Sequence, residues 1–223
     1  TAILSGDAML VLAYQFMAEC PSAFLKEVMD LFSLTALEIC EGQQMDMEFE
    51  QRNDVTAEEY LEMIRLKTAV LLAASLKIGA RLGGASVEDA DRLYDFGMHI
   101  GVAFQLKDDL LDVYGNAKVF GKNIGGDILC NKKTYMLIKA LEHANADQHN
   151  QLNSWINAET FQPAEKIAAV TELYDRIGVK AVCENKILEY SNWAMESLAA
   201  VSIAEEKKEE LKKIIENLIH REV

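Results

Sequence analysis

Almost every segment of this 223-residue chain repeats its apolar residues with the 3.6-residue period of a helix. No segment shows the alternation of apolar and polar residues that is typical of a half-buried strand. Only 2 prolines and 12 glycines interrupt the chain, and 50% of its residues are hydrophobic. This composition is typical of a helical globular protein rather than a disordered or β-rich one. The sequence therefore predicts an all-α fold.

Capping signals place two of the predicted helices. Thr56 and Glu59 have the spacing of a capping box, in which each residue satisfies a backbone N–H of the other. Ser86 opens another helix, which we expect to continue to Gly115. The helical period predicts further helices over about residues 8–17 (with Asp7 as the N-cap), 22–49, 132–143, 163–177, 178–200 and 204–220.

The bulk properties exclude several classes of protein. A formal net charge of −14 argues against a nucleic-acid-binding protein, because phosphate backbones require a basic surface. The longest apolar run, residues 69–74, is far shorter than the roughly 20 residues that span a bilayer, so we expect no membrane span. The four cysteines have no CxxC spacing, and we expect reduced, mostly buried thiols in a cytoplasmic protein; they are Cys20, Cys40, Cys130 and Cys183.

Three carboxylates lie close together in the otherwise apolar run FQLKDDLLD. Asp108 and Asp112 are four residues apart, so on a helix they share a face about 6 Å apart along the axis, with Asp109 roughly 100° around it. Like charges at this spacing destabilise a helix by a few tenths of a kcal/mol unless a cation lies between them. Mg²⁺ is suited to this arrangement because it binds one or two carboxylates, keeps waters and completes its shell with substrate phosphates.

Three lysines accompany the aspartates. Lys67 lies among apolar residues of a predicted helix, Lys122 lies in the glycine-rich segment 121–127, and Lys132 follows that segment. Each lysine alone is typical of a solvated surface residue. In a chain this acidic, however, cations near a carboxylate cluster favour a metal–diphosphate site. A metal would bridge aspartate to phosphate there, and lysine would neutralise the remaining oxygens.

The order of these motifs resembles that of a known family. The block 101–134 contains FQLKDDLLD, FGKNIGGDI and NKKT and resembles the second aspartate-rich region of the trans-prenyltransferases, the polyprenyl diphosphate synthase family. Other matches, in the family's order, are Gly6-Asp7, Gly42-Gln43-Gln44-Met45-Asp46 and Lys67-Thr68. The resemblance implies an isoprenoid-synthase-type helical bundle, of which this chain would be the C-terminal two-thirds. We expect a single domain over 1–223 without an internal linker.

The resemblance also implies a role for each matching residue. Metal ligands would hold several Mg²⁺ ions, directly or through water, and these ions would hold an allylic diphosphate; the implied ligands are Asp108, Asp109 and Asp112. Basic residues would contact the diphosphate or support the same region; they are Lys67, Lys122 and Lys132. The implied catalytic residues are Lys67, Thr68 and Gln105, of which Thr68 and Gln105 would turn polar atoms toward the allylic cation. The implied pocket residues are Gln43, Asp46 and Phe104.

The implied reaction is short-chain prenyl transfer of the farnesyl or geranylgeranyl type, a step of isoprenoid biosynthesis. The allylic diphosphate ionises, isopentenyl diphosphate attacks head-to-tail, and pyrophosphate is released. Ionisation requires the charge of the leaving diphosphate to be neutralised by metal and lysine, which is electrostatic and Lewis-acid catalysis. The family further implies a homodimer.

Two parts of the family pattern have no counterpart here. The first aspartate-rich motif, followed in the family by paired arginines, is missing, and so are the N-terminal basic residues that bind isopentenyl diphosphate. We therefore expect a domain that is incomplete at its N-terminus. We also expect this polypeptide alone to lack full activity. Product chain length cannot be predicted, because the family sets it mainly just before the missing motif.

Two other interpretations stay open. A non-catalytic regulatory subunit of a prenyl synthase would keep the fold, but it would not need Lys67, Lys122 and Lys132 beside three aspartates. A terpene cyclase of the same fold is the enzymatic alternative. Cyclases usually carry an Asn/Ser/Glu-type second metal motif, whereas this chain has a plain DDxxD preceded by FQ.

Overall fold

The structure is a computed structural model that describes residues 2–115 and 124–219. Within these two ranges every regular element is a helix, so the prediction of an all-α fold is confirmed. The N-terminal half contains α1 (Ala2–Ala18), α2 (Leu25–Phe49), α3 (Ala57–Ile64), the π-helical turn η1 (Arg65–Ala69), α4 (Val70–Leu82) and α5 (Val87–Tyr114). The C-terminal half contains α7 (Gly126–Leu129), α8 (Tyr135–His143), α9 (Ala146–Ile156), α10 (Pro163–Ile177), α11 (Val179–Ala199), the 3₁₀ turn η2 (Glu205–Lys207) and α12 (Glu209–Ile219).

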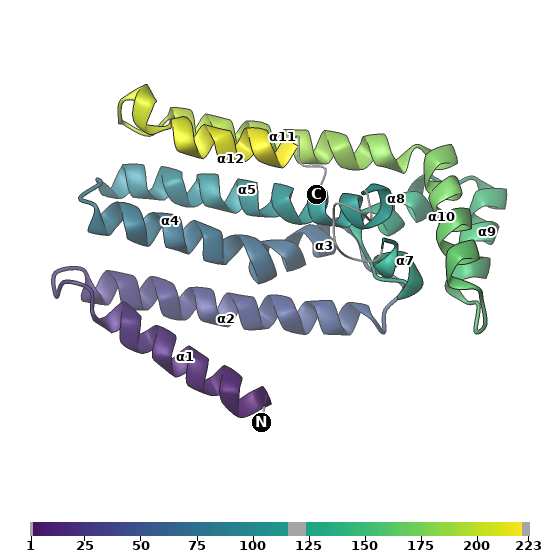
Figure 1. The fold of residues 1–223 in the computed structure, drawn as a ribbon, viewed down its shortest axis with the longest axis horizontal. Helices are drawn as coiled ribbons and strands as arrows, with labels where there is room; N and C mark the ends of the chain where they lie inside the picture. Colours follow the sequence, from purple (N-terminus) through teal and green to yellow (C-terminus); the bar gives the residue numbers. More distant parts are fainter. Residues whose placement is uncertain (1, 116–123, 220–223) are drawn as a thin grey trace.

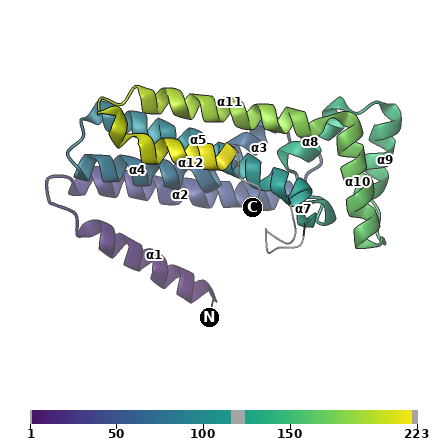
Figure 2. The ribbon, with the colours of Figure 1, turned by 45° about the horizontal axis from the view of Figure 1, so that its top comes forward.

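The long helices lie side by side along the longest axis of the molecule (Figure 1). Helix α5 lies between α4 and α11 and contacts both along much of its length, while α2 lies on the other side of α4. Helices α7 to α10 gather at one end of this bundle (Figures 1 and 2). Because α5 is packed on two sides, much of it is buried, including the segment that carries the aspartates.

The predicted capping signals are confirmed. Thr56 and Glu59 form the reciprocal capping box at the start of α3. The Ser86 side chain accepts the N–H of Asp89 at the start of α5, which runs without interruption to Tyr114. These two caps fix the start of the two segments that carry most of the predicted site residues.

Two helix starts differ from the prediction, and one helix was not predicted at all. Helix α1 begins at Ala2, so Asp7 lies inside it and is not its N-cap. Helix α8 begins only at Tyr135, because the Thr134 side chain caps it by accepting the N–H of Leu137. Lys132 therefore lies in a loop rather than on a helix. Helix α9 was not predicted, although a capping box at its N-terminus marks its start.

Two glycines allow α2 and α5 to approach the π-helical turn η1 closely. A Cβ atom added at Gly42 on α2 would lie 2.5 Å from the backbone nitrogen of Lys67. A Cβ atom added at Gly101 on α5 would lie 2.5 Å from the Cα of Ala69. No side chain fits at these distances, so the two glycines let both helices pack directly against the turn that carries Lys67 and Thr68.

The cysteine prediction is only half correct. All four cysteines are free thiols, but Cys183 alone is buried, whereas Cys40 and Cys130 are exposed and Cys20 is half-buried. The prediction of mostly buried thiols is therefore wrong, because three of the four lie on helix surfaces or at helix ends. Among the described residues, no helix combines the length and the apolar character needed to cross a membrane.

Candidate active site

The predicted catalytic pair Lys67 and Thr68 lies in η1, where the helix widens for one turn. The N–H of Val70 bonds to the carbonyl oxygen of Arg65, five residues earlier, instead of to the residue four earlier. Such π-helical turns are rare and often occur at functional sites. The widening changes the direction in which successive side chains leave the helix, and it brings Lys67 and Thr68 to the same small cavity.

This polar cavity, of about 30 Å³, brings five of the predicted residues together. They come from four separate parts of the chain: α2, η1, α5 and the loop before α8. Tyr60, Met63 and Ile64 of α3 complete the lining. The five predicted residues in the lining are Asp46, Lys67, Thr68, Gln105 and Lys132.

Lys67 is held by a carboxylate across the cavity. Its Nζ donates to Oδ2 of Asp46 at 2.7 Å, and both side chains are partly exposed. This ion pair therefore holds the ammonium group at the opening of the cavity and restricts the side chain to that position. The pair gives Asp46 a defined role as the residue that orients Lys67.

A chain of hydrogen bonds runs from the cavity into the core. The Thr68 hydroxyl donates to Oε1 of Gln105 at 3.3 Å. Nε2 of Gln105 donates to Oδ1 of Asp109 at 3.2 Å. The hydroxyl of Tyr60, which is fully buried, donates to Oδ2 of the same carboxylate. Sequence reasoning did not identify Tyr60, because a tyrosine in a helix core gives no signal before its partner is known.

Asp109, the third predicted metal ligand, lies on a more buried side of α5 than Asp108 and Asp112. Asp109 is only 2% exposed, whereas the other two are half-buried. Burial raises the pKa of Asp109 to about 7, although Lys132 and the Tyr60 hydroxyl oppose this shift. The physical reason is the roughly 100° turn between adjacent residues of a helix, which directs Asp109 toward α3. Within residues 2–115 and 124–219, no three His, Cys, Asp or Glu side chains are placed to share a metal ion.

Asp127 is a second residue that the sequence interpretation missed. Its backbone N–H donates to Oδ2 of Asp112 at 2.9 Å, which ties the start of α7 to the aspartate segment. Burial raises the pKa of the Asp127 carboxyl, and the charges of Asp112 and Asp108 raise it further while Lys132 opposes them. The available signal was its position between the glycine-rich segment and Lys132.

Lys132 lies between two carboxylates. Its Nζ is 3.7 Å from Oδ1 of Asp109 and 3.5 Å from Oδ1 of Asp127. Burial alone would lower the pKa of Lys132, but the charges of Asp109 and Asp127 outweigh it and the pKa is raised. The ammonium group therefore stays charged at the inner end of the site.

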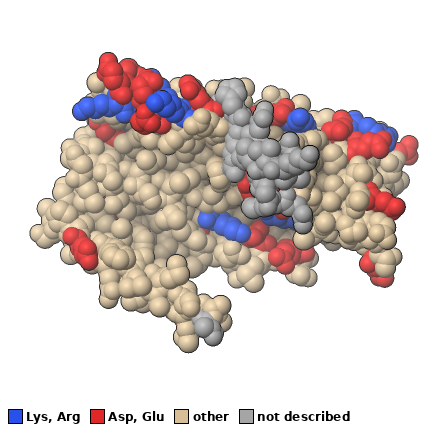
Figure 3. Space-filling view, viewed as in Figure 1, with Lys and Arg blue, Asp and Glu red and all other residues tan. Residues whose placement is uncertain are grey.

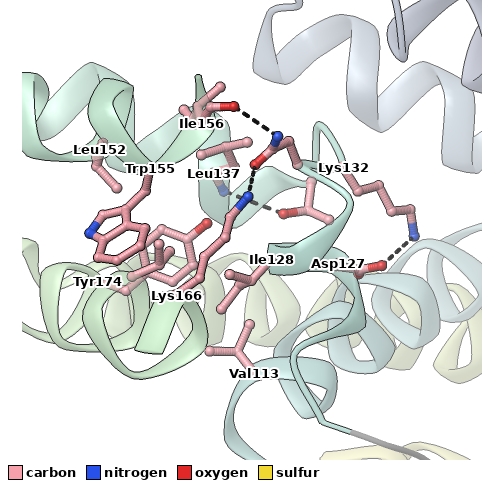
Figure 4. A pocket seen from close by; sticks show the side chains of 13 residues that line it. Val113, Asp127, Ile128, Lys132, Leu137, Leu152, Trp155, Ile156, Lys166 and Tyr174 are labelled. Atoms are coloured by element: carbon pink, nitrogen blue, oxygen red, sulfur yellow. Dashed lines mark hydrogen bonds and ion pairs between the residues drawn. The ribbon is translucent and has the colours of Figure 1, made fainter. Parts of the chain in front are cut away.

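The loop that carries Lys132 is anchored from behind (Figure 4). The buried Lys166 of α10 donates to Oδ1 of Asn131 at 2.7 Å, and Nδ2 of Asn131 donates to the carbonyl oxygen of Ile156 at 3.0 Å. Asn131 has a φ of +52°, a left-handed conformation that asparagine tolerates better than most residues. Figure 4 shows Lys132 directed toward Asp127, away from Lys166. This anchoring fixes the loop so that Lys132 faces the carboxylates.

An apolar groove of about 820 Å³ adjoins the polar cavity and shares Lys67 and Thr68 with it. Its other lining residues come from α4, α5 and α12 and are mostly apolar. Phe104, which is 40% exposed, lines this groove and not the polar cavity. On the face seen in Figure 3, uncharged side chains cover a broad area between the charged end of α12 and α1. The site thus has a charged end and an apolar extension.

Two predicted residues are not part of this geometry. Gln43 is exposed on α2 and is not among the residues that line either the polar cavity or the apolar groove. Its prediction as a pocket residue is therefore not supported by either lining. Lys122 lies outside the described residues.

The remaining carboxylates fit a divalent cation that is shared with a substrate. Asp108 and Asp112 lie four residues apart on the less buried side of α5, and their charges act on Asp127. Mg²⁺ usually takes one or two carboxylates and completes its shell with waters and substrate phosphates. These side chains therefore suit Mg²⁺ bound together with a diphosphate better than a metal held by the protein alone.

Comparison with known proteins gives one consistent result. The polyprenyl synthetase family matches residues 1–174 of the chain. The chain is 36% identical over 222 residues to the short chain isoprenyl diphosphate synthase of Methanothermobacter thermautotrophicus, a match that covers 99% of this chain and 67% of that protein. The matches cover 42% to 67% of the length of three such synthases, so the chain spans about two-thirds of these relatives or less.

The similarity extends to solved structures. A crystal structure of geranylgeranyl pyrophosphate synthase superposes with a TM-score of 0.92 at 38% identity, over 99% of this chain and 68% of that one. Geranylgeranyl pyrophosphate synthase from Corynebacterium glutamicum, complexed with isoprenyl diphosphate and magnesium, superposes with a TM-score of 0.88 at 29% identity. That match covers 98% of this chain and 62% of that chain. The helical bundle predicted from the resemblance is therefore confirmed.

Proposed function

The chain belongs to the polyprenyl synthetase family, and on that premise we propose that it carries the diphosphate-ionising part of a short-chain prenyl diphosphate synthase. The substrates would be an allylic diphosphate and isopentenyl diphosphate. Their head-to-tail condensation would release pyrophosphate.

One observation carries this proposal: a lysine-containing polar cavity and a large apolar groove share two residues, Lys67 and Thr68. A prenyl diphosphate has the same division, with a strongly charged head on an apolar chain. A diphosphate bound at the opening of the polar cavity would place its first carbon beside Lys67 and Thr68, with the hydrocarbon chain in the groove. This match of chemistry supports a prenyl diphosphate over a small polar metabolite.

The basic and acidic residues would divide the task of binding the head group. Lys67 and Lys132 would neutralise diphosphate oxygens, and Asp108 and Asp112 would hold Mg²⁺ against the same group. When bound, Mg²⁺ supplies Lewis-acid neutralisation of the leaving diphosphate. Lys122 remains a predicted diphosphate contact. Asp46 keeps the ammonium of Lys67 at the cavity, so little reorganisation is needed when the C–O bond breaks.

Thr68 and Gln105 would act on the other product of ionisation, the allylic cation. Both line the polar cavity and are joined to each other by a hydrogen bond. Side-chain oxygens placed beside a developing positive charge stabilise it most where water is excluded. The groove residues around them, including Phe104, would keep water from the cation.

The experiment that tests this function is prenyl transfer by the full-length protein, measured with labelled isopentenyl diphosphate, an allylic diphosphate and Mg²⁺. We expect Asp108→Ala to lower turnover at least about tenfold, or about 1.4 kcal/mol of barrier. The matched control is Asp95→Ala, an exposed aspartate on the same helix, which should leave turnover unchanged. Cyclic products from the wild-type protein would favour a terpene cyclase instead. No turnover, or wild-type kinetics in Asp108→Ala, would contradict the proposal.

We propose that the protein is a homodimer that pairs through α1 and α2. Helix α1 has no buried residue, and its exposed apolar side chains continue onto exposed leucines of α2. A surface of this kind marks an interface, and a second copy of the chain offers the same apolar surface in return. The exposed apolar residues of this surface include Ile3, Leu4, Met9, Val11, Phe16, Leu34 and Leu37.

Sedimentation velocity tests the dimer. The wild-type protein should sediment as a dimer, and Phe16→Glu combined with Leu37→Glu should shift it toward the monomer. Leu188→Glu, at another exposed apolar position, on α11, should not. A monomeric wild-type protein would contradict the proposal. The cytoplasmic location expected from the sequence stays a prediction.

A further inference from the structure

Both carboxyl oxygens of Asp109 accept hydrogen bonds from other side chains of the protein. Oδ2 accepts from the Tyr60 hydroxyl, and Oδ1 accepts from Gln105 at 3.2 Å and lies 3.7 Å from Nζ of Lys132. The side chain is 2% exposed, so little of it is left for a ligand from outside. This placement calls for another role than the metal binding that its sequence position suggests.

The contacts of Asp109 determine which way its neighbours point. Gln105 turns its amide NH₂ group toward Asp109, because its Nε2 donates to Oδ1 of that carboxyl group. The amide oxygen of Gln105 then faces Thr68 and accepts the hydrogen of its hydroxyl group at 3.3 Å. With that hydrogen engaged, the lone pairs of the Thr68 oxygen are left for the cavity that both residues line.

We propose that Asp109 and Tyr60 are positioning residues, which fix the polarity of Gln105 and Thr68 so that oxygen lone pairs face the site of the allylic cation. The inference rests on the proposed function and deepens it. If the amide of Gln105 were reversed, N–H groups would face Thr68, and the Thr68 hydroxyl hydrogen could turn toward the cation. That arrangement would repel positive charge. Tyr60 holds Asp109 in place through the second oxygen, from a helix 49 residues away in sequence.

The direct test is Tyr60→Phe, which removes one hydroxyl and keeps the ring. The matched control is Tyr135→Phe, the same change at another buried tyrosine, on α8. We expect Tyr60→Phe to lower kcat at least about fivefold, since small misplacements at a reacting centre cost rate. The KM values of both substrates and the Mg²⁺ concentration for half-maximal rate should stay within about twofold, because ground-state binding is not altered. Tyr135→Phe should keep kcat within about twofold of wild type.

A second variant guards against a purely structural explanation. Asp109→Asn keeps the shape of the side chain but can donate as well as accept, so it allows the amide of Gln105 to reverse. Its kcat should fall further than that of Tyr60→Phe, while its thermal unfolding midpoint stays close to that of wild type. Unimpaired kcat in both variants, or losses that appear in KM or in the Mg²⁺ requirement, would overturn the inference alone. A wild-type protein without prenyl transfer would overturn the proposed function, and this inference with it.

Discussion

The two ends of α5 each hold a nearly buried aspartate, and the pKa values of the two carboxyl groups shift in opposite directions. Asp89 near the N-terminus is 9% exposed, and Asp109 near the C-terminus is 2% exposed. Oδ1 of Asp89 accepts the N–H of Ser202 at 2.8 Å and lies 3.1 Å from Nη1 of Arg92. The hydrogen bond from the Ser202 backbone, aided by Arg92, lowers the pKa of Asp89. Burial instead raises the pKa of Asp109 to about 7.

The difference lies in the partners. Asp89 accepts hydrogen bonds from a backbone N–H and from a guanidinium group. It also lies in the first turn of a helix, where negative charge is favoured. Asp109 receives a neutral hydroxyl and a neutral amide, and its one cation is 3.7 Å away. Asp89 fastens the chain after α11 to the start of α5. These partners leave the pKa of Asp109 raised by burial, and residues with shifted pKa values often occur at functional sites.

The largest expected difference between the two ends of α5 appears in turnover when the cation beside each aspartate is replaced by methionine. Lys132→Met removes the cation beside Asp109 and a proposed diphosphate contact, so turnover should fall at least about tenfold. Arg92→Met removes the cation beside Asp89, far from the proposed site, and turnover should be unchanged. Steady-state prenyl-transfer assays on both variants measure this contrast. Equal losses would mean that the two ends of α5 do not differ in function.

A smaller effect should separate the same ends by stability. Asp89→Asn weakens a charge-assisted hydrogen bond to Ser202 and the pair with Arg92, so the thermal unfolding midpoint should fall. Turnover at a temperature well below the midpoint should not change. Differential scanning calorimetry together with the activity assay checks both halves. A loss of activity without a loss of stability would place Asp89 in the catalytic machinery and contradict the account.

The smallest effect is the pH dependence of that stability difference. The pKa of Asp89 is lowered in the folded protein below its ordinary value of 3.8. Its contribution to stability is therefore fully present above about pH 4, and it is lost as the pH falls through the folded pKa. The gap in unfolding midpoint between wild type and Asp89→Asn should be constant from pH 8 to about pH 5 and should close in more acidic solution. A gap that widens toward acid would contradict the assignment.

The same two residues show how far the sequence reaches. The Ser86–Asp89 start of α5 was predicted because capping is local and its residues lie three apart. The spacing of Asp108, Asp109 and Asp112 gave their angles around the helix, but not which side of the helix faces the core. That side is decided by α3, α4 and α11, and the partner of Asp109 is a tyrosine whose own sequence context is ordinary. Long-range contacts of this kind have no local signal.

The family resemblance recovered residues that composition and spacing could not. It grouped Asp46, Lys67, Thr68, Gln105 and Lys132, and the structure brings these five to one cavity. It did not recover the positions of Gln43 and Asp109, since a motif records residue type and order, not orientation. The packing role of the glycines that let α2 and α5 approach η1 was not predicted, because close packing becomes visible only when both helices are placed.

The division between Asp108 and Asp109 is the central claim, and metal binding tests it most directly. Mn²⁺ binding to the full-length protein, in the presence of inorganic pyrophosphate, can be followed by electron paramagnetic resonance without any turnover. We expect Asp108→Asn to weaken Mn²⁺ binding at least about tenfold and Asp109→Asn to leave it within about twofold of wild type. Equal weakening in the two variants would show that Asp109 is a metal ligand and would contradict the account.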